Sequence, residues 1–165
     1  GLPTTGLRFF TVYGPWGRPD MALFLFTKSI LNGEPIKIFN KGDMVRDFTF
    51  IDDITESLFR VINKKANSDS NFDYLKPSPS SSWAPYRIFN IGNSNPINLM
   101  EFISTIEDIL GCEAKKEFLN MQPGDVASTS ADTELLEKWV GFKPKTSIKD
   151  GIKKFIDWYK DFYNF

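Results

Sequence analysis

The sequence LRFFTVYGPWGRPDMA, residues Leu7–Ala22, joins an apolar run of strand length to a second apolar run that is long enough for a helix. The first run is rich in aromatic residues and is closed by a Tyr-Gly-Pro turn, so we predict a strand from Leu7 to Val12. Asp20 is suited to cap a helix that runs through MALFLFTKSIL and ends at Gly33. The connection contains two glycines, two prolines and Arg18, so its backbone is bent and stiffened around a permanent positive charge.

Strand-like and helix-like segments alternate along the rest of the chain. We predict strands at residues 36–39, 46–51, 87–91 and 116–119. Helices are predicted to begin near residues 53, 98, 132 and 147, and the first of them has a capping-box-like start at Asp53. The last helix should bury a stripe formed by Ile152, Phe155, Ile156, Tyr159 and Phe162. This alternation predicts an α/β architecture, interrupted by an exposed, flexible loop over the Ser-, Asn- and Pro-rich residues 67–85.

The composition limits the function classes. The chain has 165 residues, of which 41% are hydrophobic, and 20 basic side chains face 21 acidic ones. This is enough for one domain with a core, and the near-zero net charge gives no electrostatic support for a nucleic-acid partner. A single cysteine, Cys112, excludes an internal disulfide framework and fits a reducing cytosol, and with no histidine neither a structural zinc site nor a Ser-His-Asp triad is available. No apolar run is long enough to cross a membrane, and the first residues do not resemble a signal peptide.

Three short segments contain candidate binding residues. Arg18 follows a strand at the end where ligands collect in open α/β sheets, and its planar fork matches a carboxylate or phosphate, although a solvated loop arginine is an equally simple interpretation. Arg46 could hold a phosphate, or it could form a local ion pair with Asp47. Gln122 and Asp125 could bind sugar hydroxyls across a Pro-Gly turn, or they could belong to an ordinary turn.

Two acidic pairs, Asp52-Asp53 and Glu107-Asp108, are candidates for general acid–base chemistry. Each pair lies at a predicted helix start or on the polar side of a helix, where capping and solvation explain it. We therefore reject a glycosidase interpretation.

Five stretches, taken in order, resemble one family over nearly the whole chain. They are RFFTVYGPWGRPDMAL, RDFTFIDDI, APYRIFNIGNSNPI, MQPGDV and GFKPKTSIKDGI. They resemble the C-terminal half of extended short-chain dehydrogenase/reductases, the NAD-dependent epimerase/dehydratase family, and most nearly the UDP-glucuronate 4-epimerases. TVYGPWGRPDM is typical of the glucuronate enzymes, whereas RDF-x-x-x-DD and NIGN are shared by many sugar-nucleotide epimerases and dehydratases.

The resemblance implies a fold and a chemistry. The fold is the C-terminal part of a Rossmann-like enzyme, in which residues 1–165 form a sugar-nucleotide-binding portion of small mixed sheets and flanking helices. The chemistry is NAD-dependent conversion of UDP-glucuronate to UDP-galacturonate through a 4-keto sugar, in a cytoplasmic homodimer that supplies polysaccharide precursors.

The resemblance also assigns roles to individual residues. Thr11 and Arg18 would hold the sugar carboxylate, and Arg46 would bind the diphosphate. Gln122 and Asp125 would contact the phosphate–ribose region. The uracil and uridine contacts would come from Lys37, Phe39, Ala22 and Leu23, and the nicotinamide contacts from Phe10 and Val12.

Two parts of the family pattern are absent from this sequence. It has no glycine-rich turn to seat the dinucleotide pyrophosphate, and no Tyr-x-x-x-Lys pair to move a proton; Tyr159 and Lys160 are adjacent. We therefore expect no catalytic residue and no metal site in this chain, and no epimerase activity from it alone. Two alternatives stay open: another extended family member acting on a UDP-sugar, such as a 4-epimerase or a UDP-glucuronate decarboxylase, and a non-catalytic nucleotide-sugar-binding module.

Overall fold

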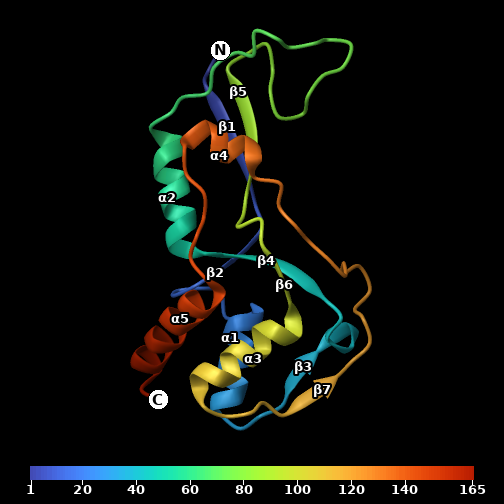
Figure 1. The fold of residues 1–165 in the computed structure, drawn as a ribbon, viewed down its shortest axis with the longest axis vertical. Helices are drawn as coiled ribbons and strands as arrows, with labels where there is room; N and C mark the ends of the chain where they lie inside the picture. The colour runs from blue at the N-terminus through green and yellow to red at the C-terminus, as the bar shows by residue number, and fades with distance from the viewer.

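The computed structural model describes all residues, Gly1–Phe165, and has an elongated shape with two packed parts (Figure 1). One part contains two parallel strands, β1 (Thr4–Phe9) and β5 (Tyr86–Ile91), covered by the helices α2 (Ile51–Ile62) and α4 (Glu134–Val140). The other part contains the helices α1 (Ala22–Leu31), α3 (Leu99–Leu110) and α5 (Ile148–Tyr163). The chain passes between the parts several times, and one of these connections is β4 (Val45–Phe50), which leads directly into α2.

The strands form three small sheets of mixed direction. β1 and β5 pair only with each other, and β3 (Ile36–Ile38) pairs in parallel with β7 (Lys116–Phe118). The central sheet has the order β2-β4-β6, in which β2 (Thr11–Tyr13) is parallel and β6 (Pro96–Asn98) antiparallel to β4. This arrangement confirms the predicted α/β class with small mixed sheets, and it adds β6, which the sequence pattern did not predict.

The predicted strand at residues 7–12 is in fact two strands in different sheets. The chain leaves β1 after Phe9, and β2 begins at Thr11 beside β4 rather than beside β5. Phe10 lies at the crossing point, where its amide still donates to the carbonyl of Ile91 at 3.1 Å. A continuous apolar run cannot reveal such a crossing, because both strands need the same residue types.

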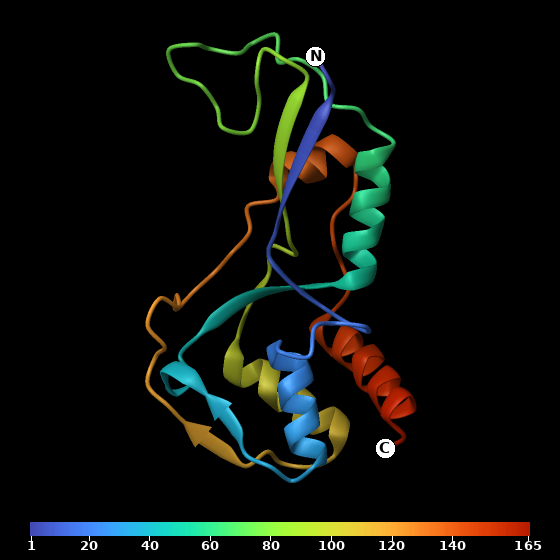
Figure 2. The same ribbon diagram turned by 180° about the vertical axis from the view of Figure 1, so that it is seen from behind.

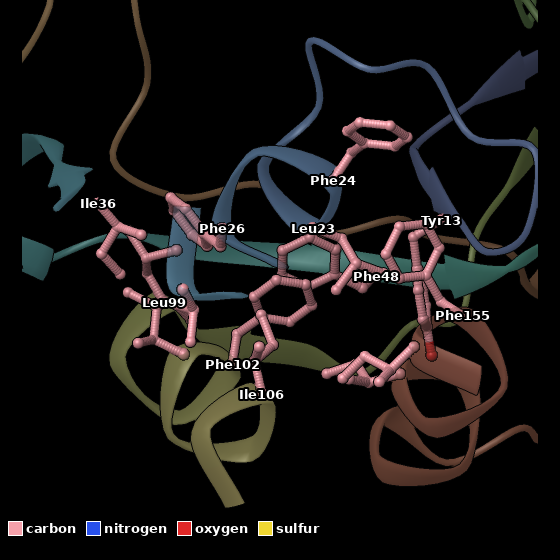
Figure 3. Packing of buried hydrophobic residues seen from close by; sticks show 14 of the residues in the cluster. Tyr13, Leu23, Phe24, Phe26, Ile36, Phe48, Leu99, Phe102, Ile106 and Phe155 are labelled. Carbon is pink, nitrogen blue, oxygen red and sulfur yellow. The ribbon is translucent and has the colours of Figure 1, made fainter. Parts of the chain in front are cut away.

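The main core lies between α1, the central sheet, α3 and α5 (Figure 3). The rings of Phe48 on β4 and Phe102 on α3 stack at a centroid distance of 4.1 Å, and Tyr13 on β2 meets both edge-on. This cluster contains 19 buried residues, whereas a second cluster under α2 and α4 contains five. The part with α1, α3 and α5 is therefore the better packed one.

The helix ends follow the predictions at α3 and α5 but not at α1 and α2. α3 and α5 begin where the sequence predicted, and there the side chains of Asn98 and Ser147 act as their N-caps. The capping predictions for Asp20 and for the segment starting at Asp53 are wrong, since α1 and α2 begin after Met21 and Phe50 without side-chain caps.

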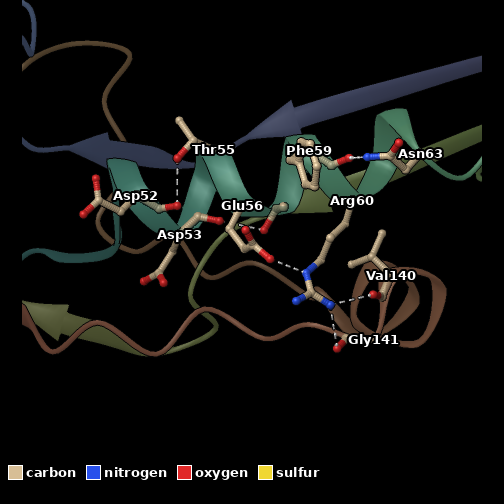
Figure 4. Close-up of polar contacts among 10 residues, drawn as sticks. Asp52, Asp53, Thr55, Glu56, Phe59, Arg60, Asn63, Val140 and Gly141 are labelled. Carbon is tan, nitrogen blue, oxygen red and sulfur yellow. Dashed lines mark hydrogen bonds and ion pairs between the residues drawn. The ribbon is translucent and has the colours of Figure 1, made fainter.

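The acidic residues of α2 instead contact other elements. The carboxylate of Asp53 accepts hydrogen bonds from the backbone amides of Lys145 and Thr146, ahead of α5. Further along α2, Arg60 donates to Glu56 and to the carbonyls of Val140 and Gly141 at the end of α4 (Figure 4). These bonds attach α2 to two distant segments of the chain.

The stripe on α5 is confirmed except at its last position. Ile152, Phe155, Ile156 and Tyr159 are buried, but Phe162 is 50% exposed. One turn beyond Tyr159 the helix projects past the core, as Figure 2 shows from behind. Helical spacing alone does not indicate where the neighbouring elements end.

The loop at residues 67–85 extends away from the body of the molecule next to the N-terminus (Figures 1 and 2). Most of its residues are exposed, as predicted, and an isolated bridge from Ser81 to Arg87 holds its end. Its mobility stays a prediction. None of the helices is both long enough and apolar enough to cross a membrane.

Candidate functional site

A groove runs along the surface formed by the start of α1, β3 and β4. It consists of two adjoining cavities of about 240 and 520 Å³ that share Ala22, Phe26, Lys37, Phe39 and Asp125 in their walls. Thr11 and Arg46 line the smaller cavity and Gln122 lines the larger one. Seven of the binding residues named from the sequence therefore surround one space, although they are up to 114 positions apart in the chain (Thr11 to Asp125).

The remaining predicted residues lie near the Thr11 end of the groove. Arg18, Val12 and the buried Leu23 line a small inner cavity that also contacts Thr11 and Ala22. Phe10 lies beside Thr11 in a shallow depression of the surface. Leu23 is part of the main core, so its side chain contributes to the floor of this region rather than to the groove itself.

Sequence reasoning missed several apolar residues of the groove. Phe26 lines both cavities, and Met21, Met44, Phe48 and Leu99 line the smaller one. Phe26 follows Ala22 by four positions on α1, so the two side chains share a helix face, and this spacing could have identified it. The others come from separate elements that only tertiary packing brings together.

Arg18 lies in the exposed loop between β2 and α1 and is paired within that loop. Its Nε and Nη2 atoms each donate to the carboxylate of Asp20 at 3.1 Å, and the two side chains are 73% and 70% exposed. The structure thus contains a fork-to-carboxylate pairing at this position, made to a neighbour in the chain. An ion pair this exposed contributes little stability, so another carboxylate can replace Asp20 at small cost.

Arg46 lines the smaller cavity together with Thr11 and is held in place by several hydrogen bonds. Its Nη2 donates to Asp125 Oδ1 at 2.8 Å, and its Nη1 donates to the carbonyls of Val45 and Ala127 at 2.9 and 3.2 Å. The Asp125 amide in turn donates to the carbonyl of Gln122 across the Pro-Gly turn. The candidate pair Gln122 and Asp125 therefore lies next to Arg46. The hydrogen bond from Arg46 to Asp125 fixes the position of the guanidinium group at the groove.

The local ion pair between Arg46 and Asp47, which the sequence left open, does not form. Successive side chains of a strand point to opposite faces, so Asp47 points away from the groove. Its carboxylate accepts three backbone N–H groups, from Asn93, Ser94 and Ala131, at 2.9–3.2 Å. Asp47 thus fastens the NIGN turn and the segment before α4 to β4.

The charges around the groove favour an anionic ligand. Lys37, Arg18 and Arg46 contribute three positive charges, whereas Asp20 and Asp125 contribute two negative ones. Lys37 projects outward from β3 because Ile36 and Ile38 on either side are buried in the core. A phosphate or carboxylate bound here would meet Lys37 and Arg46 in the groove, or Arg18 in the adjoining inner cavity.

The tyrosines nearest the site are not suited to transfer protons. Burial, and then the charges of Asp53 and Asp150, raise the pKa of Tyr13 far above its usual value. Burial, and then Tyr163, raise the pKa of Tyr159 as well. Both phenols therefore stay protonated near neutral pH.

Comparison with known proteins relates this chain to one family. The model of the NAD dependent epimerase/dehydratase family matches residues 1–92. The chain belongs to this family. The resemblance inferred from the sequence motifs is thereby confirmed.

Individual relatives extend the likeness beyond residue 92. Protein CapI from Staphylococcus aureus is 54% identical over 162 residues, which make up 98% of this chain and 48% of that protein. A probable UDP-glucuronate 4-epimerase from Rhizobium meliloti is 46% identical over 163 residues, 98% of this chain and 48% of its own length. The chain therefore spans about half the length of the curated relatives it matches.

A solved structure supports the fold over the same extent. UDP-glucuronic acid 4-epimerase from Bacillus cereus, in complex with UDP-glucuronic acid and NAD, matches with a TM-score of 0.80 and 32% identity. The match covers 98% of this chain and 46% of that one. The fold of this family member is thus that of one half of an extended short-chain dehydrogenase/reductase.

Proposed function

We propose that this chain is the substrate-binding half of an NAD-dependent UDP-glucuronate 4-epimerase. The observation that carries the proposal is that Thr11 lines both the smaller cavity of the groove, which contains Arg46, and the adjoining inner cavity, which contains Arg18. The distribution of cations suits a ligand with an anion at each end, and UDP-glucuronate has a diphosphate and a sugar carboxylate. The relatives named UDP-glucuronate 4-epimerase support the same substrate.

Thr11 and Arg18, which together we call the carboxylate clamp, would have a chemical purpose in this reaction. Oxidation of the sugar at carbon 4 gives a β-keto acid, which loses carbon dioxide when the carbon–carboxylate bond aligns with the carbonyl π system. Thr11 would donate its hydroxyl to the carboxylate, and Arg18 would pair with it in place of Asp20. Holding the carboxylate near the plane of the ketone suppresses that bond cleavage, so the acid survives until the hydride returns.

The remaining groove residues would bind the nucleotide. Arg46 would contact the diphosphate, with Gln122 and Asp125 at the adjoining phosphate–ribose region. The backbone of Lys37 and Phe39 would line the uracil pocket, and Ala22 and Leu23 at the start of α1 would lie beside the uridine. The position of these residues around one groove, with Leu23 below its Thr11 end, supports this division of roles.

This chain would supply only a small part of the NAD site, namely contacts to the nicotinamide ring. Phe10, in a shallow apolar depression beside Thr11, and Val12 would contact the nicotinamide ring. When bound, NAD supplies reversible hydride transfer at carbon 4. No glycine-rich turn is present in the 165 residues, so we assign most of the cofactor site to the remainder of a full-length protein. We also propose that this full-length protein is a homodimer.

Calorimetric titration of the full-length protein with UDP-glucuronate and UDP-glucose tests the clamp. Arg18→Ala should weaken binding of UDP-glucuronate by about 1.5–3 kcal/mol, since a charge-assisted hydrogen-bonded pair is lost. Binding of UDP-glucose, which has no carboxylate, should change little. Lys153→Ala, which removes an exposed ion pair on the outer side of α5, is the control and should leave both affinities unchanged.

An equal loss of affinity for both ligands in Arg18→Ala would contradict the clamp. The product distinguishes the proposed epimerase from a decarboxylase of the same family, because the epimerase keeps the carboxylate and the decarboxylase releases carbon dioxide. Binding of both ligands without turnover would instead indicate a non-catalytic binding module.

The isolated 165-residue chain should have no epimerase activity, because it lacks the proton-transfer pair and the pyrophosphate turn. Purified chain is incubated with NAD and UDP-glucuronate, and UDP-galacturonate is measured by chromatography. Formation of that product would refute this part of the proposal.

A further inference from the structure

Trp16 has an unusual backbone and an unusual environment. Its φ angle is 62°, in the left-handed region that bulky residues rarely adopt, and its side chain lies at the surface with 74% of the residue exposed. Glycine or asparagine would fit this backbone at lower cost. A strained conformation persists where the surroundings determine it, so we asked what the indole ring contacts.

The ring packs against two aromatic residues of α5. Its centroid lies 5.3 Å from the ring of Trp158 and 5.1 Å from that of Phe162, the latter in an edge-to-face arrangement. These distances are in the range of favourable aromatic pairs. The partner helix is firmly fixed, since Phe155 and Ile156 of α5 are almost fully buried in the main core.

The loop has few other attachments. The backbone hydrogen bonds of residues 15–20 close within the segment 14–21, from Gly17 to Gly14 and from Met21 to Arg18. The ion pair of Arg18 with Asp20 is also internal to the loop. The loop is thus fixed where Gly14 packs on Ile51 and where α1 begins, and between these points Trp16 is the residue whose ring contacts the rest of the molecule.

We infer that Trp16 is a positioning residue for Arg18, which it serves by docking the arginine loop onto α5 through Trp158 and Phe162. This inference rests on the proposed function of Arg18. Its consequence is that α5, which contributes Phe155 to the inner cavity beside Arg18 but does not line the groove, influences the preference for an acidic sugar. The left-handed backbone at Trp16 is retained because it directs the ring toward the helix.

Two substitutions distinguish the contribution of the Trp16 ring from that of its backbone conformation. Trp16→Asn keeps a residue that tolerates the left-handed conformation and removes the ring, whereas Trp16→Phe keeps an aromatic ring. In the full-length protein, Trp16→Asn should weaken binding of UDP-glucuronate by about 3- to 10-fold, as expected for the loss of aromatic contacts. The affinity for UDP-glucose should stay the same, and Trp16→Phe should restore most of the loss.

A double-mutant comparison tests whether Trp16 acts through Arg18. Adding Trp16→Asn to Arg18→Ala should cause no further loss of UDP-glucuronate affinity, because the positioned group is already gone. A selective loss in Arg18→Ala with an unchanged affinity in Trp16→Asn would overturn the inference and leave the clamp intact. An equal loss for both ligands in Trp16→Asn would also overturn it, because the effect would then be structural. Failure of Arg18→Ala itself to discriminate the ligands would instead refute the clamp, and this inference with it.

Discussion

Arg46 and Asp47 are adjacent in β4, but their side chains point to opposite faces of the strand and have different roles. Arg46 faces the groove and contacts Asp125, whereas Asp47 is fully buried and accepts three backbone N–H groups. A buried carboxylate is costly unless such donors surround it, and once surrounded it is costly to remove. At the scale of single residues, the acid beside the binding arginine is therefore a structural residue.

Asp47→Ala should destabilise the protein by about 3–5 kcal/mol, since three backbone donors, one of them on the buried Ala131, lose their acceptor together. Chemical denaturation of the wild type and the variant measures this difference. Asp43→Ala is the matched control, because Asp43 is exposed and its carboxylate makes no hydrogen bond in the structure. If the two variants were equally stable, the three-donor contact would not contribute as we propose.

Among the secondary structure elements, β7 is attached to α3 by one acidic side chain. Glu107 Oε1 accepts from the Ala114 amide at 2.7 Å and from Lys116 Nζ on β7. β7 pairs with β3, whose Lys37 lines the groove. The pair Glu107-Asp108 was considered above for acid–base chemistry. In the structure, Glu107 makes this structural contact, and Asp108 is exposed.

The pKa of Glu107 gives this contact a pH dependence. Burial alone would raise that pKa, but the hydrogen bonds from Lys116 and Ala114 and the charge of Lys116 together lower it. A carboxyl whose pKa is lower in the folded state stabilises the fold above its unfolded pKa, and the stabilisation disappears as the pH falls through the folded value.

Glu107→Gln should accordingly cost about 1–2 kcal/mol of unfolding free energy at pH 7, and the difference from wild type should shrink as the pH falls below about 4. Urea denaturation at several pH values measures it. Glu101→Gln, an exposed site on the same helix, is the control. A difference that is constant with pH would show that the charge of Glu107 is not responsible.

In the molecule as a whole, the two parts differ in how much core they have. The part with α1, α3 and α5 contains the cluster of 19 buried residues, whereas the cluster under α2 and α4 has five. β1 and β5 form a sheet of only two strands, so one edge of each is unpaired, and Phe9 of β1 is half exposed. Small two-stranded sheets are marginally stable without further packing.

Amide hydrogen exchange of the 165-residue chain should reflect this difference. We expect the amides of β4, α3 and α5 to exchange more slowly than those of β1 and β5, because local opening is easiest where few apolar contacts break. Mass spectrometry of peptides from each element measures the rates, with residues 67–85 as the fast-exchanging reference. Equal protection in the two parts would contradict this distribution of stability.

The sequence by itself determined the α/β class, most helices and the candidate binding residues. Apolar spacing identified the helices because one face of each must be buried whatever lies opposite, and Asn98 and Ser147 act as caps because capping depends on neighbours in the chain. The family motifs named Thr11, Arg18, Arg46, Gln122 and Asp125, which line adjoining cavities although the roles assigned to them stay predictions.

Only the tertiary structure decided the features that depend on segments distant in the chain. It divided the apolar run at Phe10 between two sheets, directed Asp47 and Asp53 to remote backbone amides instead of Arg46 and a helix cap, and left Phe162 beyond the core beside Trp16. The physical reason is the same in each case: a strand edge, a buried carboxylate and an apolar ring each need a partner, and the chain's local pattern specifies the need without specifying which distant segment meets it.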